Sequence, residues 1–342
     1  MPGIGAMSGK KKKAVAVPPP TQKREVEIIM EDLDDMAGGG YTLGFSGLPN
    51  TGKTTQAIGL GYLHLDFLPL YEDKFPLIAK ALRDEEIPYV NKIVIIDSEN
   101  ALRKQMKRKF SRDLFKELTD HTPIKVIRIA PVAQDVMDSV ADSMPITQES
   151  VSKVFFAIEL YEAVLRQAFD EYDEHTLFIL DSASRLYKLI NAKAQIVYNR
   201  RVQDKGEETV KNEGFNKWGN RNIWWDQDMT LLRGVPGWVV ATFQMKEKPD
   251  WVIESEKKKG KYKGAFKIVR SDDTAFNLDM DFVFSMDNDK LLSVDVEVGR
   301  YVERGEEAEE LNHVDIDTHD RFSGLQIIEN MLKVMEGQEF DD

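Results

Sequence analysis

Short runs of apolar residues alternate along this chain with longer stretches in which apolar residues recur every three or four positions. Residues 41–45, 91–97, 176–181 and 238–243 are runs rich in β-branched and aromatic residues, a composition typical of strands buried on both faces. Residues 151–172 place apolar side chains at helical spacing and predict a long amphipathic helix. Strands that alternate with helices predict an α/β fold, with a mostly parallel sheet covered by helices on both faces.

Further elements follow from the same pattern. We expect a basic helix at residues 101–118 and another helix at 223–233. Residues 251–270 are interpreted as a basic hairpin, and residues 282–286 with 291–296 as a C-terminal strand pair.

The chain has 342 residues, 42% of them hydrophobic, which is enough to bury a full core. We expect one large domain over residues 25–300, with insertions at about 65–90 and 191–220. Residues 1–24 combine Gly, Lys and Pro and predict a flexible basic arm. Residues 301–342 are expected to form an acidic tail with a short helix.

The net charge of −13 is distributed unevenly. Residues 301–342 hold 13 acidic and 3 basic residues and so carry −10, which leaves the rest of the chain near neutral. Basic clusters within that remainder keep a nucleic-acid partner possible. They are Arg103, Lys104, Lys107, Arg108, Lys109 and Arg112, followed by Lys257, Lys258, Lys259, Lys261, Lys263, Lys267 and Arg270.

The chain contains no cysteine, so disulfides and thiolate chemistry are excluded. Its apolar stretches are too short to span a membrane, and residues 1–17 lack the apolar core of a signal peptide. We therefore expect no membrane partner and a cytoplasmic location, which would be the host cytoplasm if the protein is viral.

Candidate chemistry begins with residues 47–54, which read Gly-Leu-Pro-Asn-Thr-Gly-Lys-Thr and fit the phosphate-loop pattern G-x-x-x-x-G-K-[ST]. The run lies between a predicted strand and a predicted helix, as a phosphate loop must. Backbone N–H groups of such a loop and the helix N-terminus bind triphosphate oxygens. The expected nucleotide-binding residues are Gly47, Leu48, Pro49, Asn50, Thr51, Gly52, Lys53, Thr54 and Thr55.

Two residues are candidates for holding Mg²⁺. The Thr54 hydroxyl follows the loop lysine and is expected to be a direct ligand. Asp181 ends a run of four apolar residues and matches the second nucleotide-binding signature, in which a strand delivers a carboxylate beside the phosphate loop. An aspartate at a strand end is also a common helix cap, but a preceding phosphate loop favours the metal role. Because Ser182 follows it instead of glutamate, a catalytic base must come from elsewhere.

Glu99 is the candidate catalytic base, because it follows the strand 91–97 and ligand chemistry in such sheets gathers at the carboxyl ends of strands. The alternative places Glu99 in the first turn of the next helix, where the helix dipole favours a carboxylate. Gln244 follows the strand 238–243 and would face the same crevice, where its amide could sense the γ-phosphate. A solvated loop glutamine is the alternative for Gln244.

These motifs, in this order, resemble the RecA/RadA superfamily of recombinase-type ATPases over about residues 32–300. The resemblance rests on the phosphate loop, Ile-Ile-Asp-Ser-Glu ending at Glu99, Leu-Asp-Ser around Asp181 and the strand followed by Gln244. It implies a RecA-like P-loop NTPase core in which Glu99 activates water, Lys53 binds the phosphates and Gln244 couples the γ-phosphate to DNA-binding loops.

Shorter motifs at residues 217–225, 242–247 and 261–264 resemble the phage and archaeal-virus branch of RecA-like ATPases of the AAA family. Members complete their sites with a cation from the neighbouring subunit, and Lys263, Lys267 and Arg270 are the candidates for that role. A solvated, charged hairpin is the alternative for these three residues. The chain departs from cellular recombinases in lacking a recognisable N-terminal DNA-binding domain.

We therefore expect a Mg²⁺-dependent ATPase that forms a ring or filament and acts on DNA, most readily single-stranded DNA, in recombination, repair or replication. ATP is preferred to GTP because the chain has no N-K-x-D guanine-reading motif. A ring helicase or a DNA-packaging motor is the alternative enzyme. A protein whose assembly is switched by nucleotide, without DNA, is the alternative outside DNA metabolism.

The acidic segment beyond Tyr301 suggests a further hypothesis. Its carboxylates could mimic DNA and occupy the basic surface of the same protein. Truncation near Tyr301 is then expected to tighten DNA binding.

Overall fold

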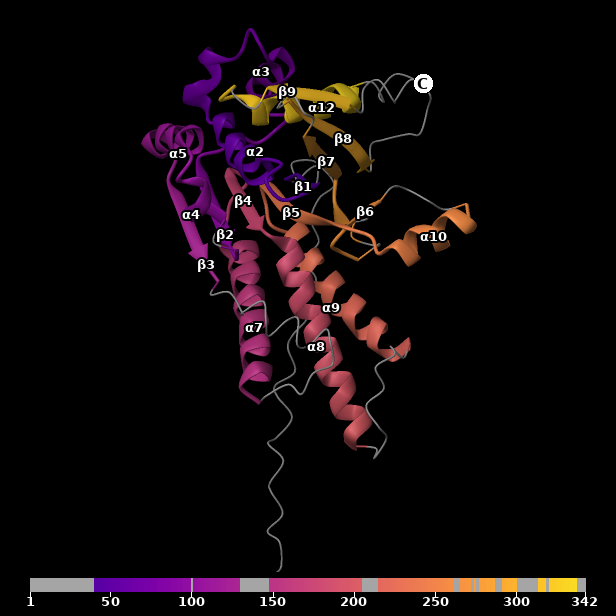
Figure 1. Cartoon of the computed structure of the whole chain (residues 1–342). Helices are drawn as coiled ribbons and strands as arrows, with labels where there is room; N and C mark the ends of the chain where they lie inside the picture. Colours follow the sequence, from indigo (N-terminus) through magenta and orange to yellow (C-terminus); the bar gives the residue numbers. More distant parts are fainter. Residues whose placement is uncertain are drawn as a thin grey trace, which may run out of the picture. The chain divides into compact units, whose positions relative to one another are not determined.

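The protein folds around one mixed sheet in its computed structural model, which describes residues 40–99, 101–129, 148–204, 215–260, 265–271, 274, 277–286, 291–299, 313–317 and 320–336 (Figure 1). The strands of the sheet are β1 (Thr42–Gly47), β2 (Lys92–Asp97), β3 (Ile124–Arg128), β4 (Thr176–Asp181), β5 (Trp238–Glu247), β6 (Phe266–Ile268), β7 (Met280–Met286), β8 (Leu291–Gly299) and β9 (His313–Asp317).

The strand order is β3-β2-β4-β5-β1-β7-β8-β9, with the short β6 paired to β5. Neighbours from β3 to β7 are parallel, whereas β7–β8, β8–β9 and β5–β6 are antiparallel. This order places β1, β4 and β5 side by side, so the segments that follow these three strands meet at one edge. The expected mostly parallel sheet and C-terminal strand pair are confirmed, and β9 adds a third antiparallel strand.

Helices cover both faces of the sheet, as the pattern of fully apolar strands predicted. Along β2, Ile93 and Ile95 face one hydrophobic cluster, while Val94 and Ile96 face the other. This alternation follows from the two-residue period of a strand and requires cover on both sides. The helices are α2 (Lys53–Gly59), η1 (Leu60–Leu63), η2 (Leu65–Leu70), α3 (Pro76–Arg83), α4 (Ala101–Gln105), α5 (Lys109–His121), α7 (Gln148–Glu171), α8 (Ala183–Asp204), α9 (Phe215–Arg233), α10 (Asp250–Lys258) and α12 (Ser323–Glu336).

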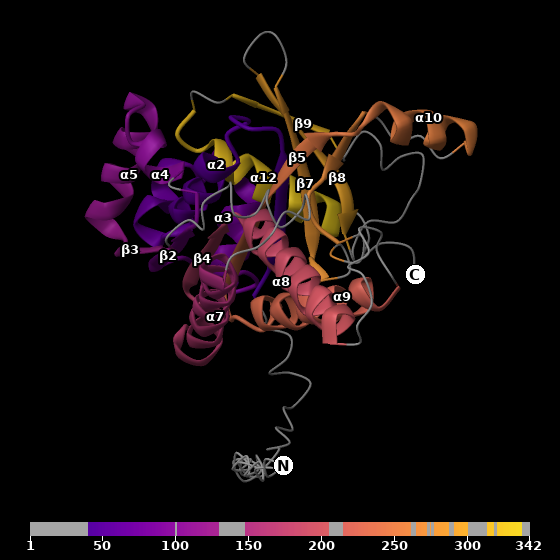
Figure 2. The same ribbon diagram turned by 60° about the horizontal axis from the view of Figure 1, so that its bottom comes forward.

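The layers are visible in two views. Helices α7, α8 and α9 lie together on one face of the sheet, and α2, α3 and α12 lie together on the other (Figures 1 and 2). The result is an α/β architecture compatible with the RecA-like core that the sequence resemblance implies.

Helix α12 belongs to the core, although composition had assigned residues 301–342 to a separate acidic tail. Leu325, Ile328 and Met331 are fully buried in the cluster that α2 and α3 share. Ser323 donates a hydrogen bond to Gln56 of α2 at 2.8 Å. The 13 acidic residues of the segment, against 3 basic ones, were given more weight than its apolar residues, which recur at helical spacing.

The two intervals expected as insertions, and the expected hairpin, look as follows in the structure. Residues 65–90 contribute buried groups such as Ile78 and Leu82 to the core. Much of the interval 191–220, which looked like a polar insertion, is helical in α8 and α9. The interval 251–270 holds α10 and the short strand β6 where a hairpin was expected.

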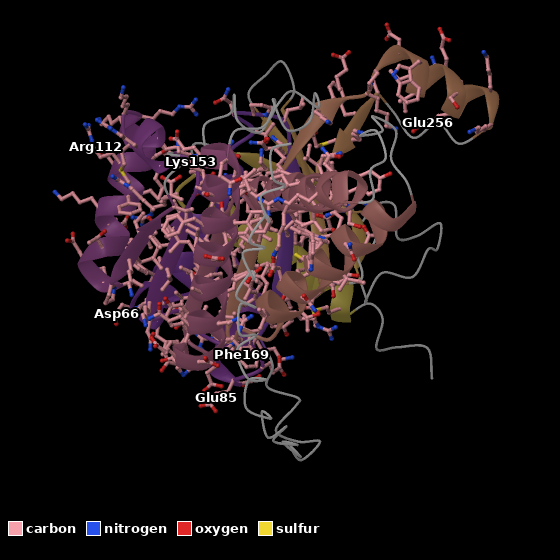
Figure 3. All side chains as sticks on the ribbon, turned by 90° about the horizontal axis from the view of Figure 1, so that it is seen from below. Asp66, Glu85, Arg112, Lys153, Phe169 and Glu256 are labelled. Carbon is pink, nitrogen blue, oxygen red and sulfur yellow. The ribbon has the colours of Figure 1, made fainter. Side chains whose placement is uncertain are left out.

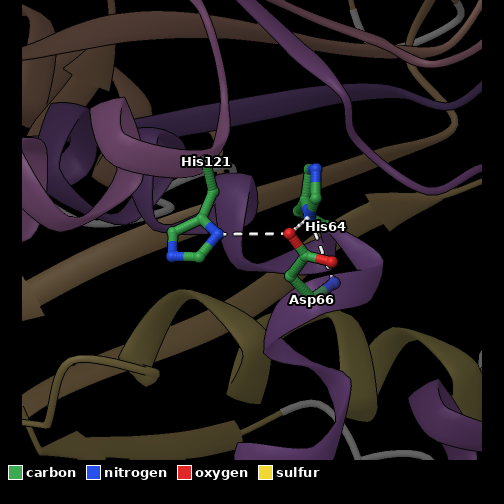
Figure 4. Close-up of polar contacts among 3 residues, drawn as sticks. All are labelled: His64, Asp66 and His121. Atoms are coloured by element: carbon green, nitrogen blue, oxygen red, sulfur yellow. Dashed lines mark hydrogen bonds and ion pairs between the residues drawn. The ribbon is translucent and has the colours of Figure 1, made fainter.

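The C-terminus of α5 is joined to η2 by a small polar cluster (Figure 4). Asp66 Oδ2 lies 3.2 Å from His121 Nδ1 and 3.8 Å from His64 Nδ1. Burial lowers the pKa of His64, and Asp66 acts in the opposite direction. Among the residues that the structure describes, no group of three His, Cys, Asp or Glu side chains is arranged to hold a metal ion.

None of the described helices combines the length and the apolar character that crossing a bilayer demands.

Candidate functional site

The phosphate-loop sequence adopts a tight turn between β1 and α2. Gly52 has φ of 84° and Asn50 has φ of 69°, both in the left-handed region that non-glycine residues other than Asn rarely adopt. A Cβ on Gly47 would lie 2.8 Å from the carbonyl oxygen of Phe284 and 2.7 Å from Thr51 Oγ1. Gly52 is therefore required by its backbone conformation, and Gly47 by the close packing around it.

Lys53 reaches back over this turn. Its Nζ donates hydrogen bonds to the carbonyl oxygens of Gly47 at 3.0 Å and Leu48 at 2.8 Å. Burial lowers the pKa of Lys53 to about 8, while Asp181 and Glu99 raise it. A phosphate group bound at the loop would therefore compete with these two backbone carbonyls for the Lys53 ammonium group.

Asp181 lies at the end of β4, beside the first turn of α2. Its Oδ2 accepts a hydrogen bond from Thr54 Oγ1 at 2.9 Å, and its Oδ1 accepts one from Thr242 Oγ1 at 2.6 Å. Burial raises the pKa of Asp181 to about 6, the two threonine hydrogen bonds lower it, and Glu99 and Asp97 raise it again. The structure therefore brings together the two residues that the sequence suggested for Mg²⁺.

The chemistry of this pair fits a Mg²⁺ ion. Both contributing atoms are oxygens, which Mg²⁺ prefers, and it normally takes only one or two protein ligands together with water and phosphate oxygens. The buried carboxylate of Asp181 also has a raised pKa, so a neighbouring positive charge would stabilise its ionised form. Thr54 is the residue that could bind the ion directly, and Asp181 the residue that could orient it.

Glu99 lies just beyond β2 and is held by two donors. Ser182 Oγ donates to Glu99 Oε1 at 2.7 Å, and Gln244 Nε2 donates to the same oxygen at 2.6 Å. Beside Glu99, Ser98 Oγ donates a hydrogen bond to the carbonyl oxygen of Asp181 at 3.0 Å, which joins the segment after β2 to the end of β4. Glu99 thus faces the site, and the alternative of a solvent-facing residue in the first turn of α4 does not describe its position.

Gln244 is fixed at two points by α8. Its backbone N–H donates to Ser184 Oγ at 2.9 Å, and its side-chain Oε1 accepts from Lys188 Nζ at 2.9 Å. Because lysine can only donate, the contact identifies the carbonyl side of the amide and leaves Nε2 as the donor to Glu99. Strand β5 continues beyond Gln244 to Glu247. Gln244 pairs with Gly47, the last residue of β1, so it lies at the point where β5 separates from β1.

The three candidates for a cation supplied to a neighbouring subunit lie in different settings. Lys263 falls outside the described residues, and Lys267 is exposed on β6 opposite Lys246. Arg270 is engaged within its own chain, because its Nη2 lies 2.5 Å from Asp281 Oδ2 and its guanidinium packs on the Phe243 ring. Donation of Arg270 to another subunit would require the loss of a buried ion pair.

Several residues of the site were not found from the sequence. Ser182 was noticed only for not being glutamate, yet it donates to Glu99. Thr242 could have been found, since it lies two positions before Gln244 on a strand and therefore points to the same face. Ser184 and Lys188 carry no signal in one sequence, because their spacing of four residues is common to every helix.

Comparisons with known proteins do not extend this picture. No protein-family model matches the chain, and no curated protein matches it. The resemblance to RecA-like ATPases therefore rests on the motifs and on the residues that surround the phosphate loop.

Proposed function

We propose that this protein is a Mg²⁺-dependent ATPase with a RecA-like core that acts on single-stranded DNA. The observation that carries the proposal is the position of Glu99, which is held by Ser182 and Gln244 beside a phosphate-loop turn and an Asp181–Thr54 pair. A phosphate loop alone indicates triphosphate binding. A buried network that orients a carboxylate next to it favours hydrolysis.

Each part of the site has a separate role in this proposal. The loop N–H groups and Lys53 bind the β- and γ-phosphates. Mg²⁺, bound by Thr54 and oriented by Asp181, would neutralise phosphate charge. Glu99 orients the attacking water and accepts its proton, while Gln244 and Ser182 hold the carboxylate in place. A cation from a neighbouring subunit in a ring or filament, for which Lys263 and Lys267 are candidates, would stabilise charge in the transition state.

The catalytic part of the proposal is tested with two variants. Lys53→Ala removes the ammonium group and is expected to abolish nucleotide binding or turnover. Glu99→Gln keeps the shape and the acceptor oxygen that Ser182 and Gln244 contact, so it should bind ATP and lower kcat at least about 100-fold. Glu159→Gln, at an exposed position of α7, is the matched control and should retain wild-type turnover. Phosphate release at saturating ATP measures all three.

The outcomes separate the candidate functions. Wild-type turnover in Glu99→Gln would remove Glu99 from the mechanism. ATP binding without any turnover in the wild-type protein would favour nucleotide-switched assembly over an ATPase. Absence of both salt-sensitive oligonucleotide binding and stimulation by single-stranded DNA would refute the DNA partner.

A further inference from the structure

The segment around α4 and α5 carries a concentration of positive charge that the catalytic site does not use. Residues 103–112 include six basic residues and no acidic one, in a chain whose net charge is −13. The five whose side chains are described are all exposed, and Arg112 points outward from α5 in Figure 3. These five form what we call the α4–α5 ridge: Arg103, Lys107, Arg108, Lys109 and Arg112.

The ridge lacks internal counter-ions. Within the described part of the chain, none of its five side chains lies within ion-pair distance of a carboxylate. Some exposed cations elsewhere are paired, as Lys74 is with Asp320 and Arg321 with Glu117. Clustered cations repel one another unless an anion is supplied, so the ridge is suited to an external polyanion.

The surroundings of the ridge favour one class of polyanion. Leu114 and Leu118 of α5 are buried in the core, and Phe110 and Phe115 are partly buried against the same cluster. Among described residues, none of the large exposed hydrophobic side chains falls within 101–121, and the nearest along the chain is Val126 of β3. An amphipathic membrane helix needs exposed apolar side chains to insert, and the centre of a protein interface is depleted of charged residues. A phosphodiester backbone needs only the cations.

The ridge is also connected to the proposed catalytic site. Helix α4 begins two residues after Glu99. It contacts α2, the helix that follows the phosphate loop, through a hydrogen bond from Thr55 Oγ1 to Gln105 Oε1 at 3.2 Å. A ligand that orders α4 would therefore act on the two segments that position Glu99 and the nucleotide.

We propose that the α4–α5 ridge binds a nucleic-acid phosphodiester backbone, which is that of single-stranded DNA under the proposed function, and that this contact stimulates ATP turnover. The predicted effect on ATP turnover rests on the proposed function. The predicted binding of nucleic acid to the ridge does not depend on ATP hydrolysis. Three to five exposed cations within ten residues of the chain imply binding that is strongly salt-dependent and little affected by base sequence.

The test uses the full-length protein and a fluorescent single-stranded oligonucleotide. Replacement of Lys107, Arg108 and Arg112 with Gln is expected to weaken binding at least about tenfold at 0.1 M salt and to reduce the slope of log K against log salt by about 2. A matched triple variant, Lys257→Gln with Lys258→Gln and Lys259→Gln, removes the same charge from exposed positions at the C-terminal end and C-cap of α10 and should bind within about twofold of wild type. The charge-conserving triple Lys107→Arg, Arg108→Lys and Arg112→Lys should retain binding, which separates charge from folding.

Two results would overturn the proposal: oligonucleotide affinity of the ridge variant within twofold of wild type, or equal losses in the ridge and α10 variants. Loss of binding to vesicles of anionic lipid, with oligonucleotide affinity unchanged, would identify the ridge as a membrane surface instead. Turnover without DNA should be unchanged in the ridge variant while stimulation by DNA is lost. If the wild-type protein binds oligonucleotide through the ridge but does not hydrolyse ATP, the proposed ATPase fails and the ridge assignment stands.

Discussion

Lys53 of the phosphate loop is a residue whose pKa is changed by burial. Burial lowers its pKa to about 8, so a substantial fraction of the free protein carries a neutral amine above that pH. A bound triphosphate favours the ammonium form and raises the pKa again. We therefore expect proton uptake on nucleotide binding near pH 8, and an affinity that falls by up to about tenfold per pH unit above it.

Isothermal titration calorimetry with a non-hydrolysable ATP analogue, in buffers of different ionisation enthalpy, measures this proton uptake. Lys53→Met has no titrating group and serves as the control. Its residual binding should show no proton uptake between pH 7.5 and 9, and equal uptake in both proteins would assign the titration to another group.

Lys188 acts on Glu99 through Gln244 and is a positioning residue in the proposed mechanism. Without its ammonium group the amide of Gln244 can turn and present its oxygen to Glu99, which is repulsive. Lys188→Met is expected to lower kcat about tenfold with little change in KM for ATP, since one charge-assisted hydrogen bond contributes about 1.5–3 kcal/mol.

A double-mutant cycle distinguishes positioning from a general loss of stability. Gln244→Leu removes the group that Lys188 orients, so adding Lys188→Met to it should cost no further activity. Additive losses in kcat would show that Lys188 acts by another route. Lys188→Arg keeps a donor and should recover part of the activity.

At the scale of elements, the helical layer α7–α8–α9 encloses an ionisable residue. Asp228 of α9 is buried, and its Oδ2 has no hydrogen-bond partner among the described residues. Burial raises its pKa to about 7, Glu162 of α7 raises it further, and Lys193 of α8 and Arg166 of α7 lower it. The folded protein therefore binds a proton at pH values where the unfolded chain has released it.

The sign of the pH dependence follows from that difference. Between the ordinary carboxyl pKa near 4 and about 7, the wild-type protein should lose about 4 kcal/mol of unfolding free energy as the pH rises. Asp228→Asn is neutral throughout and should lack this contribution. Urea denaturation at pH 5, 6, 7 and 8 measures it, with Asp170→Asn on the exposed face of α7 as the control that keeps the wild-type slope. Parallel profiles for wild type and Asp228→Asn would contradict the expectation.

At the scale of the whole molecule, the C-terminal segment joins the same core as the phosphate loop. Residues Gly38–Asp342 form one compact unit, and Leu325, Ile327, Ile328 and Met331 of α12 are almost completely buried. Burial of each large aliphatic side chain contributes about 1.5–3 kcal/mol. Removal of residues 301–342 should therefore remove most of the stability of an ordinary domain.

Thermal denaturation of two truncated chains checks this expectation. The chain that ends at 300 should lack a cooperative transition, whereas the chain that ends at 336 should melt close to wild type. A wild-type melting temperature in the shorter chain would show that α12 contributes nothing. Because truncation near Tyr301 removes part of the core, competition between the acidic segment and DNA is better tested by replacing Glu306, Glu307, Glu309 and Glu310 with Gln, and unchanged DNA affinity would refute it.

Local pattern was sufficient for much of this molecule. The strands β2, β4 and β5 were predicted because strands buried on both faces must be apolar throughout. The phosphate loop was predicted because its glycines are required by the backbone at fixed positions, as Gly52 shows with its positive φ. The helix α12 was underestimated because the net charge of residues 301–342 was given more weight than the spacing of their apolar residues.

What the sequence determined by itself is therefore the set of elements and the loop that links β1 to α2, since both depend on residues that are neighbours along the chain. Only the tertiary structure decided that Glu99, Ser182 and Gln244 share a hydrogen-bond network, that Lys188 fixes the Gln244 amide, and that Arg270 is paired with Asp281. Those contacts join residues far apart in the sequence, and strand order and helix packing, which one sequence does not record, determine which of them meet.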